Sequence, residues 1–298
     1  LERRFSRHPD IKSDYIQFMI LDPLKKLRVV FDASSKTSSN QSLNDILLVG
    51  PKLQQDIVKL ISNFRTHKIV FTIDICKMYR QILVRPEDRS YQHILWRESP
   101  EQTIKEFELQ TVTYGTASAP FIAIRTLHQL ASDADAKFST ASKVLLENTY
   151  VDDILTGAST LESARKLQRD LVELLNLGGF ELTKYSSNCR ELLSDIPISH
   201  QEAPIEIDLD HANNIKILGI VWDSQTDSFS YRVKTSQITF SKRSILSTIA
   251  KIFDPLGWIS PVTFLAKCLL QQLWNYGGGG LLGCYHPSMS GHCSILPV

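Results

Sequence analysis

The chain has 298 residues, enough for one large domain or two ordinary ones, and its 43% hydrophobic and 22% charged residues exclude a disordered protein. No apolar run reaches the roughly 18 residues that a membrane span needs, and the five scattered cysteines favour a reducing compartment over a disulfide framework. The net charge of +1 combines an acidic segment, 195–215, with a mildly basic remainder, which is compatible with a polyanionic partner without requiring one.

The first half of the chain alternates short apolar runs with amphipathic segments. Residues 27–31 predict a strand, and Pro51 begins a helical pattern. Residues 69–73 predict a second strand that ends at Asp74, which is therefore a lone carboxylate at a strand end. Ala119 begins another predicted helix. At helical spacing this helix carries Phe121, Ile124, Leu127, His128 and Leu130.

The next predicted unit is a hairpin followed by a helix. Residues 149–157 predict two short strands that flank an acidic turn. Ser159 and Glu162 form a capping box, which predicts that Ser159 caps the following helix. That helix is predicted to end at Gly178-Gly179.

The last third of the chain changes from strands to helices. Residues 215–222 predict a strand, with a hairpin turn at 223–228. One helix is predicted over roughly 238–253, and Ser260 caps a second that runs to Trp274.

Two carboxylate features point to chemistry. Asp74 ends a strand, and the adjacent pair Asp152-Asp153 lies at a hairpin tip. Two carboxylate-bearing strands side by side can hold two divalent metals about 4 Å apart, the arrangement that phosphoryl transfer between nucleotides uses. Oxygen ligands suit Mg²⁺. The alternative interpretation of the Asp152-Asp153 pair is a solvated turn.

Several phrases follow one another in an order that resembles the motif series of reverse transcriptases. They are residues 71–82, 114–121, 150–153, 182–184 and 218–222. Three flanking phrases resemble specifically the reverse transcriptase region of Pao-type (BEL/Pao) LTR retrotransposon polyproteins. They are residues 27–34, 42–45 and 250–258, so the resemblance covers about residues 27–276.

This resemblance implies an α+β, right-hand polymerase fold with fingers, an antiparallel-sheet palm and a helical thumb. The implied bounds are the N-terminal part of the fingers at 1–66, the palm at 67–84 and 118–233, the remainder of the fingers at 85–117, the thumb at 234–276, and a disordered tail outside the family pattern at 277–298.

The resemblance also implies DNA synthesis on an RNA or DNA template with a primer, from dNTPs, with two Mg²⁺ ions or with Mn²⁺. It implies no membrane partner and an intracellular location, in a cytoplasmic virus-like particle or the nucleus. The implied metal-binding and catalytic residues are Asp74 and Asp152, which would bridge the metals, and Asp153 as the supporting member of the pair. Lys184 is implied as the general acid for pyrophosphate. The implied nucleotide contacts are Arg28, Tyr114, Gly115 and Tyr79, which would act as the steric gate against a 2′-hydroxyl. The implied primer-grip residues are Leu218, Gly219 and Trp222.

Simpler interpretations exist for most of these residues. Tyr79 can be a packing residue, Lys184 a solvated strand lysine, Trp222 a core residue of a plain hairpin, and Arg28 surface charge. Two further pairs, Cys284 with His286 and His292 with Cys293, match no zinc-knuckle spacing.

Two other functions compete with polymerisation. One is an inactive retrotransposon remnant that binds only nucleic acid or protein. The other is a different two-metal palm enzyme such as a nucleotide cyclase, which requires neither an aromatic residue five positions after Asp74 nor a thumb. We expect the chain to be a piece of a longer polyprotein with a shortened fingers segment. It should therefore bind Mg²⁺ or Mn²⁺ through its three aspartates but polymerise poorly or not at all.

Overall fold

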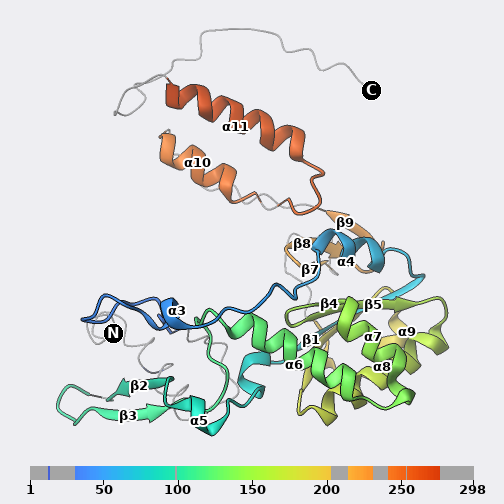
Figure 1. Ribbon diagram of the computed structural model, residues 1–298. Helices are drawn as coiled ribbons and strands as arrows, with labels where there is room; N and C mark the ends of the chain where they lie inside the picture. Colours follow the sequence, from blue (N-terminus) through green and yellow to red (C-terminus); the bar gives the residue numbers. More distant parts are fainter. Residues whose placement is uncertain are drawn as a thin grey trace. The chain divides into compact units, whose positions relative to one another are not determined.

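The central feature of the fold is a four-stranded antiparallel sheet of order β4-β5-β1-β6, which carries both predicted aspartate motifs (Figure 1). The computed structural model describes residues 13, 31–97, 99–202, 214–230, 241–252 and 254–275.

Helices and strands are mixed along the chain before β6, the fourth strand of this sheet. They are α3 (Leu43–Ile46), α4 (Ile57–Phe64), β1 (Ile69–Ile75), a 3₁₀ turn (Met78–Gln81), α5 (Pro86–Arg89), β2 (His93–Trp96), β3 (Lys105–Glu108), α6 (Ala119–Asp133), a 3₁₀ turn (Ala136–Phe138), α7 (Ser139–Glu147), β4 (Thr149–Tyr150), β5 (Asp153–Ala158) and α8 (Leu161–Leu177). The elements that follow are β6 (Leu182–Ser187), α9 (Arg190–Leu193), a 3₁₀ turn (Ile198–His200), β7 (Asn214–Ile217), β8 (Ile220–Asp223), β9 (Ser228–Ser230), α10 (Lys242–Ala250) and α11 (Ser260–Asn275).

Strand β1 divides its side chains between a dry face and a polar face. Phe71, Ile73 and Ile75 belong to the buried apolar cluster, whereas Thr72 and Asp74 between them are partly exposed. This alternation follows from the period of two residues in a strand. It leaves the Asp74 carboxylate on the opposite face of the sheet from the core.

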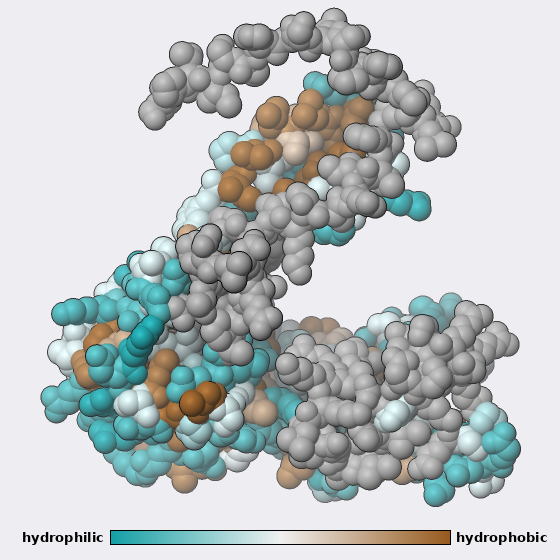
Figure 2. All heavy atoms as spheres, turned by 180° about the vertical axis from the view of Figure 1, so that it is seen from behind, coloured by the Kyte–Doolittle hydropathy of each residue, from teal (hydrophilic) through white to brown (hydrophobic). Residues whose placement is uncertain are grey.

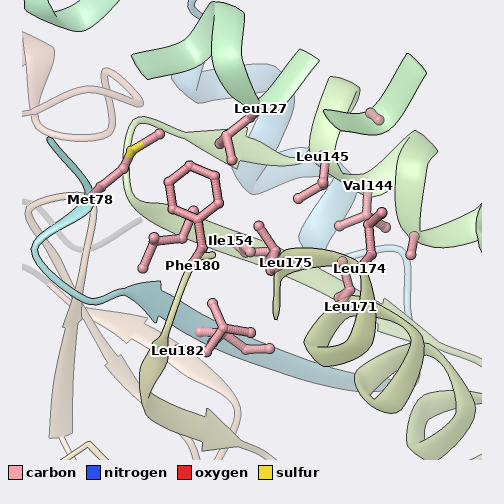
Figure 3. Packing of buried hydrophobic residues seen from close by; sticks show 14 of the residues in the cluster. Met78, Leu127, Val144, Leu145, Ile154, Leu171, Leu174, Leu175, Phe180 and Leu182 are labelled. Atoms are coloured by element: carbon pink, nitrogen blue, oxygen red, sulfur yellow. The ribbon is translucent and has the colours of Figure 1, made fainter. Parts of the chain in front are cut away.

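The apolar core fills the space between the dry face of the sheet and helices α6, α7 and α8. Leu127 of α6, Leu145 of α7 and Leu174 of α8 converge there on Ile154 of β5 and on Phe180 (Figure 3). Each of these five side chains is at most 2% exposed. The core therefore fixes the sheet from one side and leaves the other side available for polar residues.

Helix α6 packs through a different face from the one that its bulky residues suggest. Its buried residues are Ala119, Ala123, Leu127 and Ala131, so of the five side chains at helical spacing only Leu127 is fully buried. Alanine at three of these four positions lets the helix backbone approach the core closely, which the spacing of large side chains alone does not reveal.

Four helix starts differ from their predicted positions. Helix α10 begins at Lys242 rather than near residue 238, and α11 already includes Ser260, the residue predicted to cap it. Helix α4 begins at Ile57 rather than at Pro51, because the Asp56 side chain accepts hydrogen bonds from the N–H groups of Val58 and Lys59. Helix α8 is capped by Thr160, not by the predicted Ser159. The predicted hairpin at 149–157 and the helix end at Gly178 are confirmed.

The chain forms two compact units, Leu1–Leu218 with Asp223–Ser228, and Gly219–Trp222 with Phe229–Val298. The boundary falls within a three-stranded sheet of order β7-β8-β9. The prediction of one strand over 215–222 was wrong, because Leu218 and Gly219 both have positive φ and separate β7 from β8.

Helices α10 and α11 of the second unit carry large apolar side chains on their surface, and Figure 2 shows these gathered on one face. Exposed residues of this kind are Leu246, Val262, Phe264, Leu265, Leu269 and Trp274. Among the helices in the described ranges, none combines the length and the apolar composition needed to cross a membrane.

Several predicted features lie outside the described residues. They are the strand at 27–31 except its last residue, Arg28, the two Cys and His pairs after residue 283, and the tail 277–298.

We expect Thr160→Ala to lower the free energy of unfolding by about 1 kcal/mol, because the Thr160 hydroxyl accepts the Ser163 N–H at the start of α8. Ser159→Ala is the matched control and is expected to change stability little. Urea unfolding of both variants would measure this, and an equal or larger loss for Ser159→Ala would contradict the assignment of the cap.

Candidate active site

The register of β1 and β5 brings the two predicted aspartate motifs together. Asp74 is the direct antiparallel partner of Asp153, and the Ile75 N–H donates to the Asp152 carbonyl at 2.8 Å. Directly opposed residues of an antiparallel pair have their Cβ atoms about 5 Å apart. The three aspartates that the sequence singles out therefore lie at one end of the four-stranded sheet, Asp74 and Asp153 on adjacent strands and Asp152 in the loop before β5.

A tight turn presents the aspartate pair. Tyr150 pairs with Asp153, so Val151 and Asp152 form a two-residue hairpin loop. Val151 has φ +55°, in the left-handed region that favours glycine or asparagine. A β-branched residue is strained in this region, so the local preferences of the turn residues do not stabilise this turn by themselves.

A bulge in β6 directs Lys184 to the same site. Between the register pairs Thr72–Ser186 and Asp74–Thr183, β1 has one residue and β6 has two. Lys184 is one of these two residues and has φ +53°. A bulge of this kind turns side chains to a different face, and here the Lys184 Nζ donates to Asp74 Oδ2 at 2.7 Å.

A small polar cavity of about 60 Å³ lies over these residues. Asp74, Asp153 and Lys184 line it, and so does Glu202. The Glu202 N–H donates at 2.9 Å to the carbonyl of Tyr185, the residue that follows Lys184, and this hydrogen bond fixes the Glu202 backbone. Four charged side chains from three strands and one loop therefore meet in a space that can hold only a few waters or a cation.

The electrostatics of the cavity reflect an excess of carboxylates. Burial, together with the nearby charges of Asp152 and Asp74, raises the pKa of Asp153 to about 7. Burial also raises the pKa of Glu202. Burial alone would lower the pKa of Lys184, but its hydrogen bond to Asp74 and the surrounding carboxylates raise it overall.

The donor set suits a hard cation, although in this conformation no ligand cluster is assembled. Among the described residues, no group of three or more His, Cys, Asp or Glu side chains has the geometry to hold a metal ion. Asp74 Oδ2 is instead hydrogen-bonded to the Lys184 ammonium. Carboxylate oxygens are nevertheless the ligands that Mg²⁺ prefers. Repulsion from Asp152 and Asp74 adds to burial in raising the pKa of Asp153, and a bound cation would relieve that repulsion.

Two aromatic residues from distant motifs meet near the end of β1. The rings of Tyr79 and Tyr114 have centroids 4.8 Å apart and planes inclined by 48°. Tyr79 is partly buried and packs against the core. The structure therefore brings together two of the four residues for which nucleotide contact is predicted, and their roles remain predictions.

The turn after Tyr114 is held by a side chain from α3. The Asn44 Nδ2 donates to the Gly115 carbonyl at 3.0 Å, and the Asn44 Oδ1 accepts the Ala117 N–H at 2.8 Å. Gly115 has φ +103°, which only glycine adopts readily. Asn44 thus fixes the position of a predicted substrate-binding segment.

The predicted primer-grip residues form a hairpin. Leu218 and Gly219 make its two-residue turn, with φ +47° and +89°. Trp222 is completely buried, in agreement with the alternative interpretation that it is a core residue. Any contact with a primer would therefore come from the turn, not from the Trp222 side chain.

Three residues of this site were missed from the sequence. Glu202 lines the cavity, Asn44 holds the Gly115 turn, and the Gln54 side chain contacts the Val151 turn. Residues 42–45 form one of the phrases that resemble the Pao-type reverse transcriptase region, and this resemblance could have singled out Asn44. Glu202 was noted only as one member of an acidic segment, and Gln54 had no signal.

Because the folded state raises the pKa of Asp153 from an ordinary 3.8 to about 7, it retains a proton that the unfolded chain releases between these values. Wild-type stability should therefore fall as the pH rises from about 4 to about 7. We expect Asp153→Asn to be the more stable protein at pH 8, by on the order of 1–3 kcal/mol, and the difference to disappear toward pH 4.

Thermal unfolding from pH 4 to pH 8 in metal-free buffer would measure this difference. Asp195→Asn, which alters an exposed carboxylate, is the control. A difference between wild type and Asp153→Asn that does not depend on pH would contradict the expectation.

The fold is similar to that of solved retroviral reverse transcriptases. A foamy viral protease-reverse transcriptase in complex with double-stranded DNA matches with a TM-score of 0.56 and 13% identity, over 88% of this chain and 39% of that chain. A foamy viral protease-reverse transcriptase in complex with an RNA/DNA hybrid matches with a TM-score of 0.50 and 11% identity, over 78% of this chain and 27% of that one. The chain thus spans well under half the length of these proteins, and at such identities the likeness shows the fold, confirming the predicted α+β polymerase architecture.

Comparison with curated proteins finds no match. Two family models match the sequence. Residues 241–278 match the Pao retrotransposon-like RNaseH-like domain, over the segment for which the sequence predicts a thumb and in which the structure describes α10 and α11. Residues 9–221, well over half of the chain, match the reverse transcriptase (RNA-dependent DNA polymerase) model. The chain therefore belongs to the reverse transcriptase family, as the reverse transcriptase region of a Pao-type retrotransposon.

Proposed function

We propose that this chain catalyses template-directed DNA synthesis by two-metal nucleotidyl transfer at the site of Asp74, Asp152 and Asp153. The observation that carries the proposal is the β1–β5 register, which opposes Asp74 and Asp153 at the end of a sheet in a chain of the reverse transcriptase family. In the proposed reaction the primer 3′-hydroxyl oxygen bonds to the α-phosphorus of a dNTP, and the bond to pyrophosphate breaks.

The aspartates would hold the divalent cations. When bound, two Mg²⁺ ions would align the hydroxyl with the α-phosphate and offset the negative charge that develops in the transition state. Asp74 and Asp153 supply carboxylate oxygens from adjacent strands, and Asp152 supplies a third from the hairpin loop. Asp74 and Asp153 lie on the side of the sheet opposite the apolar core, where they line the small polar cavity.

Lys184 is proposed as the proton donor to pyrophosphate. Its ammonium lies 2.7 Å from Asp74 Oδ2, and its raised pKa keeps it protonated at neutral pH. Cations bound at Asp74 would compete with this ion pair and release the ammonium toward the leaving group. Glu202, in the same cavity, would then remain as a carboxylate partner for Lys184.

The proposed partners are a template–primer duplex and dNTPs. The similar foamy viral proteins were solved with an RNA/DNA hybrid and with double-stranded DNA, and the common fold extends this expectation to the present chain by analogy. The ring pair of Tyr79 and Tyr114 would lie under the sugar of the incoming nucleotide.

Primer extension on an RNA template tests the proposal. We expect slow extension with Mg²⁺ or Mn²⁺, reduced at least about a hundredfold by Asp74→Asn, because a neutral amide is a poor cation ligand. Asp133→Asn, which changes an exposed carboxylate on α6, should extend like the wild type. Absence of extension by the wild type, or equal rates for the wild type and Asp74→Asn, would overturn the proposal in favour of an inactive nucleic-acid or protein binder.

If Tyr79 excludes a 2′-hydroxyl, Tyr79→Ala should raise the ratio of ribonucleotide to deoxyribonucleotide incorporation by about tenfold or more, because a small side chain leaves room for the extra group. Metal binding should not change. Tyr91→Ala, at an exposed aromatic residue, serves as the control. An unchanged ratio in single-nucleotide incorporation would identify Tyr79 as a packing residue only.

A further inference from the structure

The side-chain amide of Gln54 contacts the backbone on both sides of Tyr150, the residue that precedes Val151. Its Oε1 accepts the Val151 N–H at 3.1 Å, and its Nε2 lies 3.4 Å from the Thr149 carbonyl, to which it donates. Gln54 precedes α4 and is 97 residues from Val151 in the sequence. Because β4 is an edge strand, this amide satisfies a donor and an acceptor that no further strand takes up.

The turn needs such a restraint because its own residues disfavour it. Val151 has φ +55°, and a branched Cβ makes that conformation unfavourable for valine. Two-residue hairpin loops of this kind usually contain glycine, asparagine or aspartate at positive φ. A hydrogen bond to the Val151 N–H opposes the rotation of this peptide toward ordinary extended values.

The conformation of Val151 determines the directions of the two residues that follow it. Asp152 completes the loop, and Asp153 begins β5 opposite Asp74. On the far side the Asp152 carbonyl is fixed by the Ile75 N–H at 2.8 Å. The aspartate pair is thus held between β1 on one side and Gln54 on the other.

We propose that Gln54 is a positioning residue of the polymerase site, which holds Val151 at positive φ and thereby aims the Asp152 and Asp153 carboxylates at the cations. This inference rests on the proposed function. Gln54 contacts the turn through the turn's backbone, so it acts on the site through the two aspartates. Loss of a group that orients metal ligands typically lowers metal affinity or activity by about 10- to 100-fold.

The neighbouring residue provides a matched control. Gln55 has the same side chain, but its Nε2 donates to the Leu146 carbonyl in α7 at 3.1 Å rather than to the turn. We expect Gln54→Leu to weaken Mn²⁺ binding about tenfold and to lower kcat in primer extension more than it changes KM for the dNTP. Gln55→Leu should leave both quantities close to the wild type.

A second substitution separates positioning from packing. Glycine adopts positive φ without a steric penalty, so adding Val151→Gly to Gln54→Leu should recover most of the Mn²⁺ affinity. Titration calorimetry with Mn²⁺ on the full chain measures this. Equal Mn²⁺ affinity for the wild type and Gln54→Leu overturns the inference. A loss of Mn²⁺ affinity that Gln55→Leu also shows, and that adding Val151→Gly does not restore, overturns it as well.

The same variants distinguish this inference from the proposed function. A wild type that neither binds Mn²⁺ nor extends a primer would overturn the function itself. In that case the thermal stabilities of the two single variants and the double variant still test whether Gln54 holds Val151. A smaller destabilisation by Gln54→Leu in the Val151→Gly background supports the restraint, and additive effects overturn it.

Discussion

The site depends on the antiparallel register of β1 and β5, which places Asp74 directly opposite Asp153, the residue after Asp152. Bringing these carboxylates together is electrostatically unfavourable. Burial, together with repulsion from Asp152 and Asp74, raises the pKa of Asp153 to about 7, which is the physical sign of this cost. The aspartates cannot relax apart, because the apolar cluster behind β1 and β5 fixes both strands. The packing of α6, α7 and α8 against the sheet thus stabilises a surface that is unfavourable in itself.

Backbone strain gathers around the same surface. Among the described residues, Asn40 and Asp227 are non-glycine residues with positive φ in other turns. The four remaining ones are Lys77 after β1, Val151 in the hairpin loop, Lys184 in the β6 bulge and Leu218 in the β7–β8 turn. Each lies in or next to a motif that resembles a reverse transcriptase motif. Such conformations persist only where the surrounding structure over-determines them, and they cluster at functional sites. At Val151 and Lys184 the surrounding hydrogen bonds are visible.

Two amide side chains play equivalent structural roles on either side of the site. Asn44 bridges the Gly115 carbonyl and the Ala117 N–H, and Gln54 bridges the Thr149 carbonyl and the Val151 N–H. Each amide offers one acceptor and one donor in a fixed plane, as a backbone peptide does. Both come from the segment 42–56, which therefore links the predicted nucleotide-binding turn to the aspartate turn through side chains alone.

The amino-acid sequence by itself determined the elements whose signals are local. Alternating or helical hydrophobic patterns and turn residues gave β1 ending near Asp74, the hairpin that presents Asp152, and the helix that ends at Gly178, because these depend on neighbours within a few residues. Tertiary structure alone decided which face of α6 is buried, the bulge that turns Lys184 toward Asp74, and the arrival of Glu202 and Gln54. These contacts join residues up to 110 positions apart, and they are set by sheet register and by packing against a shared core, which no local pattern encodes.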